Sequence, residues 1–219
     1  MKIGTDAVLL GAWTPCKNEN RILDIGTGSG ILALMMAQRN ANAEIDAVEI
    51  DPDAAELAKL NVQLSPWSTR IRIFNASVQE FSSENKLTYT LIVCNPPFFT
   101  DSLKAPSKSR NLARHNDSLP VKDLLECTSN LLTENGKASF IVPADAYDNW
   151  KIEASKNQLF PSYVTSVKSS PAHSPHRVMI TFDRNEKTEI RENEICIYSS
   201  EKIQSEEYRA ITADFYLKF

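Results

Sequence analysis

The sequence predicts an α/β fold in which a mostly parallel sheet is covered by helices on both faces. Short apolar runs alternate with helix-forming segments along most of the chain, as in βαβ units. A glycine-rich turn at 26–30 follows the first apolar run directly. The 219 residues suffice for one domain with its own core, so we expect residues 1–219 to form a single domain.

In the first part of the chain, turns and helix-capping residues predict where the strands and helices lie. The run 21–25 is short and apolar, and 30–39 is rich in residues of high helix propensity. Asp51 can cap a helix that has Pro52 in its first turn, where the missing N–H costs nothing. That helix stops before Pro66. The predicted elements are strands 21–25, 44–50, 70–74 and 88–94, with helices 30–39 and 52–64.

In the second part of the chain, one glycine and one proline-rich loop indicate where elements end. Gly136 suits the C-terminal cap of a preceding helix. A loop rich in Pro, Ser and His at 169–176 separates two late strands, and the acidic C-terminal part has only a weak strand pattern before a helix. The predicted strands are 137–142, 162–168, 177–182 and, weakly, 194–198; the predicted helices are 121–133, 145–158 and 205–215.

The charge of the chain is uneven. Its formal net charge is −4, which by itself argues against a nucleic-acid binder. Two windows, 100–122 and 151–182, nevertheless each carry a net charge of +3. The first contains His115, and the second contains His173 and His176. The average therefore conceals two basic segments.

Cysteine usage and the chain start bear on the compartment. Four cysteines lie far apart without a C-x-x-C pair, which disfavours a zinc site and a disulfide scaffold. His173 and His176 have helical ligand spacing, but neighbouring prolines forbid a regular helix there. No signal-peptide pattern opens the sequence, and no apolar run approaches a membrane span of ~20 residues. We expect a cytoplasmic protein without a metal.

The turn Asp24-Ile-Gly26-Thr-Gly28-Ser-Gly30 is the first motif with chemical content. Its G-x-G-x-G spacing differs from the dinucleotide fingerprint and from the P-loop. Its glycines allow the backbone to pass close to a ligand. We expect the Asp24 carboxylate to face the cleft, where it would repel a pyrophosphate and attract an ammonium group.

A second acidic residue ends the next strand. Glu49 follows Asp24 by 25 positions, and an acid at this place in a βαβ unit can accept both ribose hydroxyls. The glycine turn, Asp24 and Glu49 together indicate a site for a nucleoside with a cationic amino-acid tail. S-adenosylmethionine fits that description better than NAD.

The fourth strand runs into Asn95-Pro96-Pro97-Phe98-Phe99. Two prolines in series fix φ and remove two donors, which leaves the Asn95 side chain and the Pro96 carbonyl as rigid acceptors. An exocyclic amine on a planar group can donate to both, and Phe98 offers a face for stacking. The motif indicates methyl transfer to an amide-like or aromatic amino nitrogen, without a covalent intermediate.

These motifs together resemble the class I S-adenosylmethionine-dependent methyltransferases of the N-P-P-[FY] type. Further segments are similar to the bacterial valine-tRNA adenine-37 N6-methyltransferase family, and the resemblance spans nearly the whole chain. The segments that carry it are Met1–Trp13, Ser65-Pro66-Trp67, Pro175–Val178 and Phe215–Leu217. The resemblance implies a Rossmann-like class I methyltransferase fold with a mostly parallel seven-stranded sheet and one antiparallel late strand. Within it, 1–20 would be a cofactor-side segment, 21–160 the cofactor-binding and catalytic core, and 161–219 the substrate-side part.

The resemblance also implies roles for residues that match the family. Those expected to hold S-adenosylmethionine are Thr5, Asp24, Gly26, Gly28, Gly30, Glu49, Ile50, Ala76 and Ser77; those expected to hold the target adenine are Asn95, Pro96, Pro97 and Phe98. Relatives usually carry Asp at the position of Ser77, to bond the cofactor's adenine amine. They also begin with some tens of residues before Lys2, so we expect the usual N-terminal segment to be missing from this chain.

A methyltransferase acting on tRNA needs a base turned out of the stack, which an anticodon loop supplies at low cost. The basic windows would then contact RNA phosphates. Arg114 resembles the family's Ala-Arg-(His/Tyr) stretch after the N-P-P loop. The residues expected to bind substrate are Phe99, Lys104, Lys108, Arg110, Arg114, His115, Lys168 and Arg177.

The sequence therefore favours a monomeric enzyme that methylates adenine N6 in tRNA, beside the anticodon. Three alternatives stay open at this point. An amide nitrogen also fits the N-P-P motif, as in a protein glutamine N5-methyltransferase. A guanine-N2 methyltransferase of ribosomal RNA is the second, and an inactive module that binds S-adenosylmethionine or RNA is the third.

Overall fold

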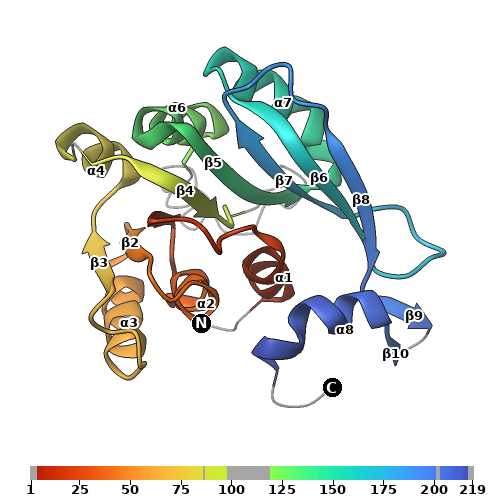
Figure 1. Cartoon of the computed structure of the whole chain (residues 1–219), viewed down its shortest axis with the longest axis horizontal. Coiled ribbons are helices and arrows are strands. Elements are labelled where there is room, and N and C mark those ends of the chain that lie inside the picture. Colours follow the sequence, from red (N-terminus) through yellow and green to blue (C-terminus); the bar gives the residue numbers. More distant parts are fainter. Residues whose placement is uncertain (1–3, 86, 98–118, 201–202, 217–219) are drawn as a thin grey trace, which may run out of the picture.

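A twisted eight-stranded sheet forms the centre of the molecule (Figure 1). The computed structural model describes residues 4–85, 87–97, 119–200 and 203–216. The strand order is β3-β2-β1-β4-β5-β7-β6-β8, and β7 alone runs antiparallel to its neighbours. The strands are β1 (Arg21–Ile25), β2 (Glu44–Glu49), β3 (Ile71–Asn75), β4 (Tyr89–Cys94), β5 (Leu132–Pro143), β6 (Phe160–Lys168), β7 (Arg177–Asp183) and β8 (Arg191–Cys196).

The α/β class and the antiparallel late strand are confirmed, whereas the expected number of strands is wrong. The eighth strand is β8, which lies at the sheet edge and pairs in parallel with β6. Its first four residues, 191–194, are exposed. Without a buried face the strand lacks the alternation of apolar and polar residues by which strands are recognised in a sequence, and only its end was predicted.

Helices cover both faces of the sheet (Figure 1). The apolar side chains of α1, α2, α3 and α8 share one buried cluster, and those of α4, α6 and α7 share the other. The helices are α1 (Thr5–Trp13), α2 (Ile31–Arg39), α3 (Pro52–Gln63), α4 (Val78–Glu84), α6 (Val121–Leu131), α7 (Tyr147–Lys156) and α8 (Glu206–Thr212). Two single 3₁₀ turns, 144–146 and 213–215, and a small hairpin of β9 (Tyr198–Ser200) and β10 (Ile203–Gln204) complete the described elements.

Helix α3 shows how closely the sequence determines its local structure. Asp51 accepts hydrogen bonds from the backbone N–H groups of Asp53 (2.9 Å) and Ala54 (3.0 Å). Pro52 occupies the first turn. The helix therefore begins at the residue that the capping pattern predicts.

Helix α1 joins the start of the chain to the late strands. The indole N–H of Trp13 donates to Thr165 Oγ1 at 2.9 Å, and its ring stacks on Tyr163 with centroids 4.7 Å apart. Both partners belong to β6. The C-terminal end of α1 is thereby held against β6. Its first turn is held by the ion pair of Asp6 with Arg177 (2.8 Å), at the edge of the sheet that carries the functional site.

That edge collects the ends of several strands. Ile25 pairs with Val48 and Cys94, so β1, β2 and β4 end beside one another. Because β7 is antiparallel, it begins at this edge, where Arg177 pairs with Pro143. Strands β6 and β8 both end here as well. Ligands of such sheets bind outside the carboxyl ends of the strands.

Candidate active site

A pocket of about 1000 Å³ opens at this edge, a volume at the upper end of the usual range for ligand sites. The ends of β1, β2, β3 and β4 form one part of its wall, and the first turn of α1 forms another. Leu119, Pro120 and Leu124, before and within the first turns of α6, also line the pocket, as do the late residues His176, Ile197 and Tyr198.

The glycine turn adopts a backbone conformation that depends on glycine. Gly26, Gly28 and Gly30 have φ of 69°, 57° and 85°, a region that residues with a Cβ rarely adopt. A Cβ on Gly30 would also lie 3.4 Å from Ala58 Cβ, in ordinary contact with α3. Gly26 and Gly28 line the pocket, so the turn exposes backbone directly to a ligand.

Asp24 lies beneath this turn and not on the pocket wall. Its side chain is fully buried, and Oδ2 accepts from Thr27 Oγ1 (2.5 Å) and the Ala33 N–H (3.1 Å). Oδ1 is buried without a hydrogen-bond partner among the described residues. Burial raises the pKa of Asp24 to about 7. The expectation that its carboxylate faces the cleft is therefore wrong, because the carboxylate is turned inward to hold the turn onto α2.

Glu49 is oriented by the backbone around it. Oε2 accepts from the Gly28 N–H (2.8 Å) and Oε1 from the Asp51 N–H (3.0 Å). The residue is 9% exposed and lines the pocket. Each carboxylate oxygen keeps a further lone pair for a ligand. Beside it, the exposed Ile50 presents an apolar side chain to the same pocket.

Ala76 and Ser77 also line the pocket, where β3 leads into α4. Ser77 Oγ accepts from the Glu80 N–H (3.2 Å) and donates to Glu80 Oε2 (2.8 Å). Glu80 Oε2 in turn accepts from the Ser77 N–H at 3.1 Å, which completes a capping box. The Ser77 hydroxyl thus has both of its usual roles filled by the helix.

Asn95, Pro96 and Pro97 follow β4 and line the pocket. The Asn95 residue is half-buried, and its Oδ1 has no hydrogen-bond partner among the described residues. Burial, with the nearby Asp24 and Glu49 carboxylates, holds the pKa of the adjacent Cys94 thiol well above its usual value. A protonated thiol is a poor nucleophile. The site therefore offers the neutral acceptor Asn95 Oδ1, and Cys94 is not suited to form a covalent intermediate.

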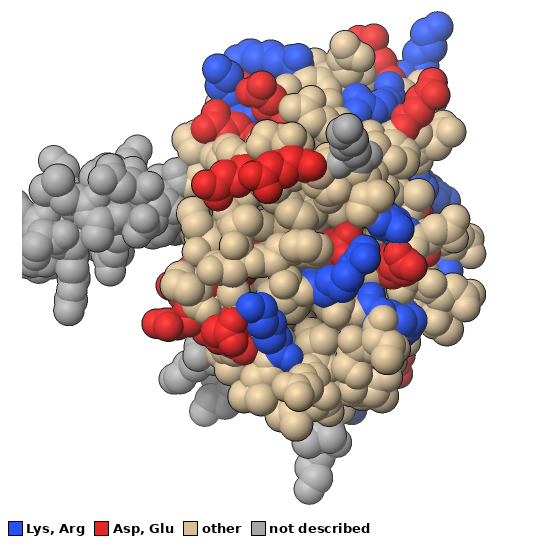
Figure 2. Space-filling view, turned by 90° about the vertical axis from the view of Figure 1, so that its left-hand side faces the viewer, with Lys and Arg blue, Asp and Glu red and all other residues tan. Residues whose placement is uncertain are grey.

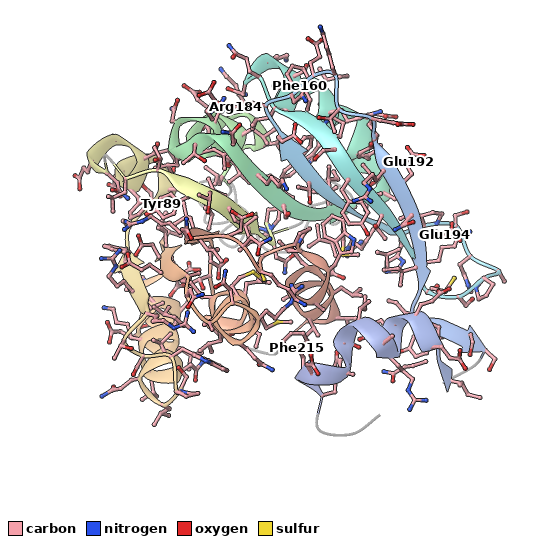
Figure 3. The ribbon with its side chains drawn as sticks, viewed as in Figure 1. Tyr89, Phe160, Arg184, Glu192, Glu194 and Phe215 are labelled. Atoms are coloured by element: carbon pink, nitrogen blue, oxygen red, sulfur yellow. The ribbon has the colours of Figure 1, made fainter. Side chains whose placement is uncertain are left out.

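The residues expected to bind the substrate divide into two groups. Phe98 and Phe99 lie outside the described residues, as do Lys104, Lys108, Arg110, Arg114 and His115. In the second window, the Lys168 ammonium pairs with Glu194 at 2.9 Å, with Glu194 on the edge strand β8 (Figure 3). Arg177 Nε pairs with Asp6 Oδ2 at 2.8 Å. Both expected phosphate contacts are therefore engaged within the protein.

Figure 2 shows the face that carries α3, β3 and α4. Acidic and basic side chains intermingle there. Arg72 of β3 pairs with the buried Asp46 at 2.7 Å, so its charge is balanced within the protein. Among the described residues drawn on this face, no broad basic patch marks a nucleic-acid surface.

Sequence reasoning missed several lining residues. Asp6 reaches the pocket because α1 begins there, and Leu119 because α6 does. His176 was noted for its charge window, its spacing from His173 and the resemblance of 175–178, but not as part of this pocket. Ile197 and Tyr198 were noted only as part of a weak strand. The signal for these late residues lies in the topology, since an antiparallel β7 returns the chain to the same edge.

The described residues contain no group of three or more His, Cys, Asp or Glu side chains able to hold a metal. Within the same part of the chain, no helix combines the length and apolar character that crossing a membrane requires.

Comparisons with solved structures support the fold. A predicted O-methyltransferase from Agrobacterium tumefaciens superposes with a TM-score of 0.75 at 17% identity, covering 95% of this chain and 96% of that one. Geranyl diphosphate C-methyltransferase from Streptomyces coelicolor superposes with a TM-score of 0.58 at 12% identity, covering 82% of this chain and 76% of that one. At such identities the likeness concerns the fold alone.

Sequence comparisons define the family. The methyltransferase small domain model matches residues 3–142. A Bacteroides fragilis protein named tRNA1(Val) (adenine(37)-N6)-methyltransferase is 46% identical over all of this chain and 92% of its own length. Two proteins of the same name also match across the whole chain. The one from Flavobacterium psychrophilum is 43% identical over 93% of its own length, and the one from Yersinia pseudotuberculosis is 36% identical over 87% of its own length. The chain thus belongs to the methyltransferase small domain family and, within it, to the tRNA1(Val) (adenine(37)-N6)-methyltransferases.

Proposed function

We propose that this chain methylates the exocyclic N6 of an adenine in tRNA, adenine 37 beside the anticodon, with S-adenosylmethionine as methyl donor. The observation that carries the proposal is the buried, unpartnered Oδ1 of Asn95 in the same pocket as the glycine turn and Glu49. Leaving a buried acceptor unsatisfied costs about 1–3 kcal/mol. An amine that donates to Asn95 Oδ1 would remove this cost.

The residues around the glycine turn suit the cofactor. Glu49, fixed by two backbone N–H groups, can accept the ribose hydroxyls, and Ile50 and Ala76 provide apolar surface for an adenine ring. Gly26 and Gly28 allow close approach of the methionine part, with Thr5 at the start of α1 nearby on the wall. When bound, S-adenosylmethionine supplies an electrophilic methyl group.

Asn95 Oδ1 and the Pro96 carbonyl accept hydrogen bonds from the two N–H groups of the target amine. They orient the amine and stabilise the positive charge that develops on nitrogen as it is alkylated. No nucleophilic side chain is needed, in agreement with the protonated state of Cys94. Phe98 would stack on the ring of the adenine, as its place in the N-P-P-F motif suggests.

The RNA must present this adenine unstacked, which favours an anticodon loop over a paired stem. The basic segment 100–122 follows the N-P-P motif directly and supplies five Lys or Arg residues. We therefore assign phosphate contacts first to Lys104, Lys108, Arg110 and Arg114. Lys168 and Arg177, already paired with carboxylates, would contribute less.

The test is methyl transfer from labelled S-adenosylmethionine to total tRNA from a strain that lacks this modification. Digestion of the tRNA and chromatography identify the labelled nucleoside, and an oligonucleotide map locates it. N6-methyladenosine at position 37 is expected. Label in ribosomal RNA as N2-methylguanosine, or in a protein glutamine, would contradict the proposal in favour of those reactions. Cofactor binding without transfer to any substrate would favour an inactive module.

A further inference from the structure

The late strands bring two aromatic residues to the pocket. His176 precedes β7, and Tyr198 begins β9 directly after β8 and Ile197. Both residues line the pocket at the edge where β6 ends. Tyr198 is 40% exposed, which leaves much of its surface open to solvent or to a ligand.

Hydrogen bonds to the end of β6 hold both residues in place. The Tyr198 N–H donates to the Ser169 carbonyl and the Ile197 N–H to the Lys168 carbonyl, each at 2.9 Å. On the other side, the His176 N–H donates to the Val167 carbonyl at 3.0 Å. Ser205 N–H closes the root of the hairpin by donating to Ile197 at 2.9 Å. Because these bonds fix the backbone at both residues, no loop has to be ordered when a partner stacks on either ring.

The sheet order separates this part of the pocket from the catalytic motif. Strands β5, β7 and β6 lie between β4, which leads into Asn95, and β8, which leads into Tyr198. Four interstrand spacings amount to roughly 19 Å along the sheet. A purine whose amine reaches Asn95 is much shorter than this, so a ring stacked on Tyr198 would belong to a different group of the substrate.

We propose that Tyr198, with His176 beside the end of β6, forms a stacking surface for a second nucleobase of the RNA, away from the methylated adenine. The inference rests on the proposed function. Splayed loop bases are bound mainly by stacking on aromatic side chains. The neighbouring ion pair of Arg177 with Asp6 cancels charge at this end of the pocket, which favours a planar uncharged group over a phosphate.

The experiment measures RNA affinity separately from catalysis. The dissociation constant of a fluorescent anticodon stem-loop is determined by anisotropy without cofactor, for the full chain and its Tyr198→Ala and Tyr198→Phe variants. Stacking of one base predicts at least about a fivefold weaker complex for Tyr198→Ala and little change for Tyr198→Phe. Ile203→Ala is the matched control, because Ile203 is an exposed residue of the same hairpin that does not line the pocket.

Removing single bases from the RNA then locates the contact. One abasic position other than the target should weaken binding to the wild-type chain and have no further effect on Tyr198→Ala. Coupling only at the target adenine would overturn the proposal, as would equal losses for Tyr198→Phe and Tyr198→Ala, or unchanged binding in Tyr198→Ala. If the wild-type chain modifies no tRNA, the proposed function fails; if it does and Tyr198→Ala binds normally, only this inference fails.

Discussion

At the residue scale, the Asn95 side chain gives the sharpest test of the chemistry. Its Oδ1 has no partner among the described residues, so Asn95→Ala removes an acceptor that the folded protein itself does not use. We expect kcat to fall by at least about a hundredfold, the loss of an interaction made with the reacting nitrogen. The cofactor dissociation constant, measured by calorimetry, should change less than about threefold.

Asn75 provides a comparison of the same residue type. Its Nδ2 donates to the carbonyls of Glu49 (2.9 Å) and Ile50 (3.2 Å), beside the proposed cofactor subsite. Asn75→Ala should therefore disturb cofactor affinity more than kcat. A parallel loss of cofactor affinity in Asn95→Ala would instead identify Asn95 as a cofactor ligand.

Asp24 makes stability depend on pH through its burial. Its pKa in the folded chain is raised to about 7, whereas the ordinary value is 3.8. The folded state therefore binds more protons than the unfolded state between these values, and this group's contribution is lost as pH rises through about 7. The slope is at most about 1.4 kcal/mol per pH unit.

The variant Asp24→Asn should abolish this slope. Urea denaturation at several values from pH 5 to pH 8 would show the wild-type free energy of unfolding decreasing relative to that of the variant. Thr27→Val, which removes the hydroxyl that donates to Asp24 Oδ2, should keep a pH dependence of the same sign. Parallel curves for wild type and Asp24→Asn would refute the raised pKa.

At the element scale, the sequence predicts best where caps are local. The glycine turn, α2 and the Asp51 cap of α3 lie within one or two residues of their predicted positions. Helix α6 differs: it ends at Leu131, and Gly136 lies inside β5. The Arg184 guanidinium donates to the Ser129 carbonyl at 2.5 Å near the end of α6, with Arg184 reaching in from the end of β7 (Figure 3). A cap supplied from so far along the chain has no local signature.

The candidate site divides in the same way. Glu49, Asn95 and the glycines could be placed because each lies at the end of a strand or follows one, whereas the inward direction of Asp24 depends on contacts with α2. Helix α1 was not predicted. All its residues from Ala7 to Trp13 are buried, so its sequence lacks the single apolar stripe by which a surface helix is recognised. Tyr198 required the full strand order.

The capping box at α4 allows a test of an element's stability. Ser77→Ala should lower the free energy of unfolding by about 1 kcal/mol, because it removes an N-cap acceptor. Ser77→Asp keeps a capping acceptor and should recover most of this loss. Chemical denaturation measures both. Ser83→Ala, an exposed serine of the same helix whose hydroxyl donates to the Glu80 carbonyl, is the control and should change stability less.

At the scale of the whole molecule, the net charge of −4 is compatible with RNA binding only if the cations act locally. Lys168 and Arg177 are paired with Glu194 and Asp6. Folding therefore neutralises much of the window 151–182. The other basic segment, 100–122, has a net charge of +3 by sequence. Salt dependence of RNA binding can distinguish the two windows.

Each contact of a cation with a single-stranded phosphate adds about 0.7 to the slope of log K against log salt. Replacing Lys104, Lys108, Arg110 and Arg114 by Gln should thus reduce the slope by up to about 3, as measured by anisotropy with a tRNA anticodon arm between 50 and 300 mM KCl. Lys168→Gln should leave the slope nearly unchanged, because its ammonium already lies 2.9 Å from Glu194. An equal reduction from Lys168→Gln alone would mean that RNA displaces this ion pair, and that the late strands share in phosphate binding.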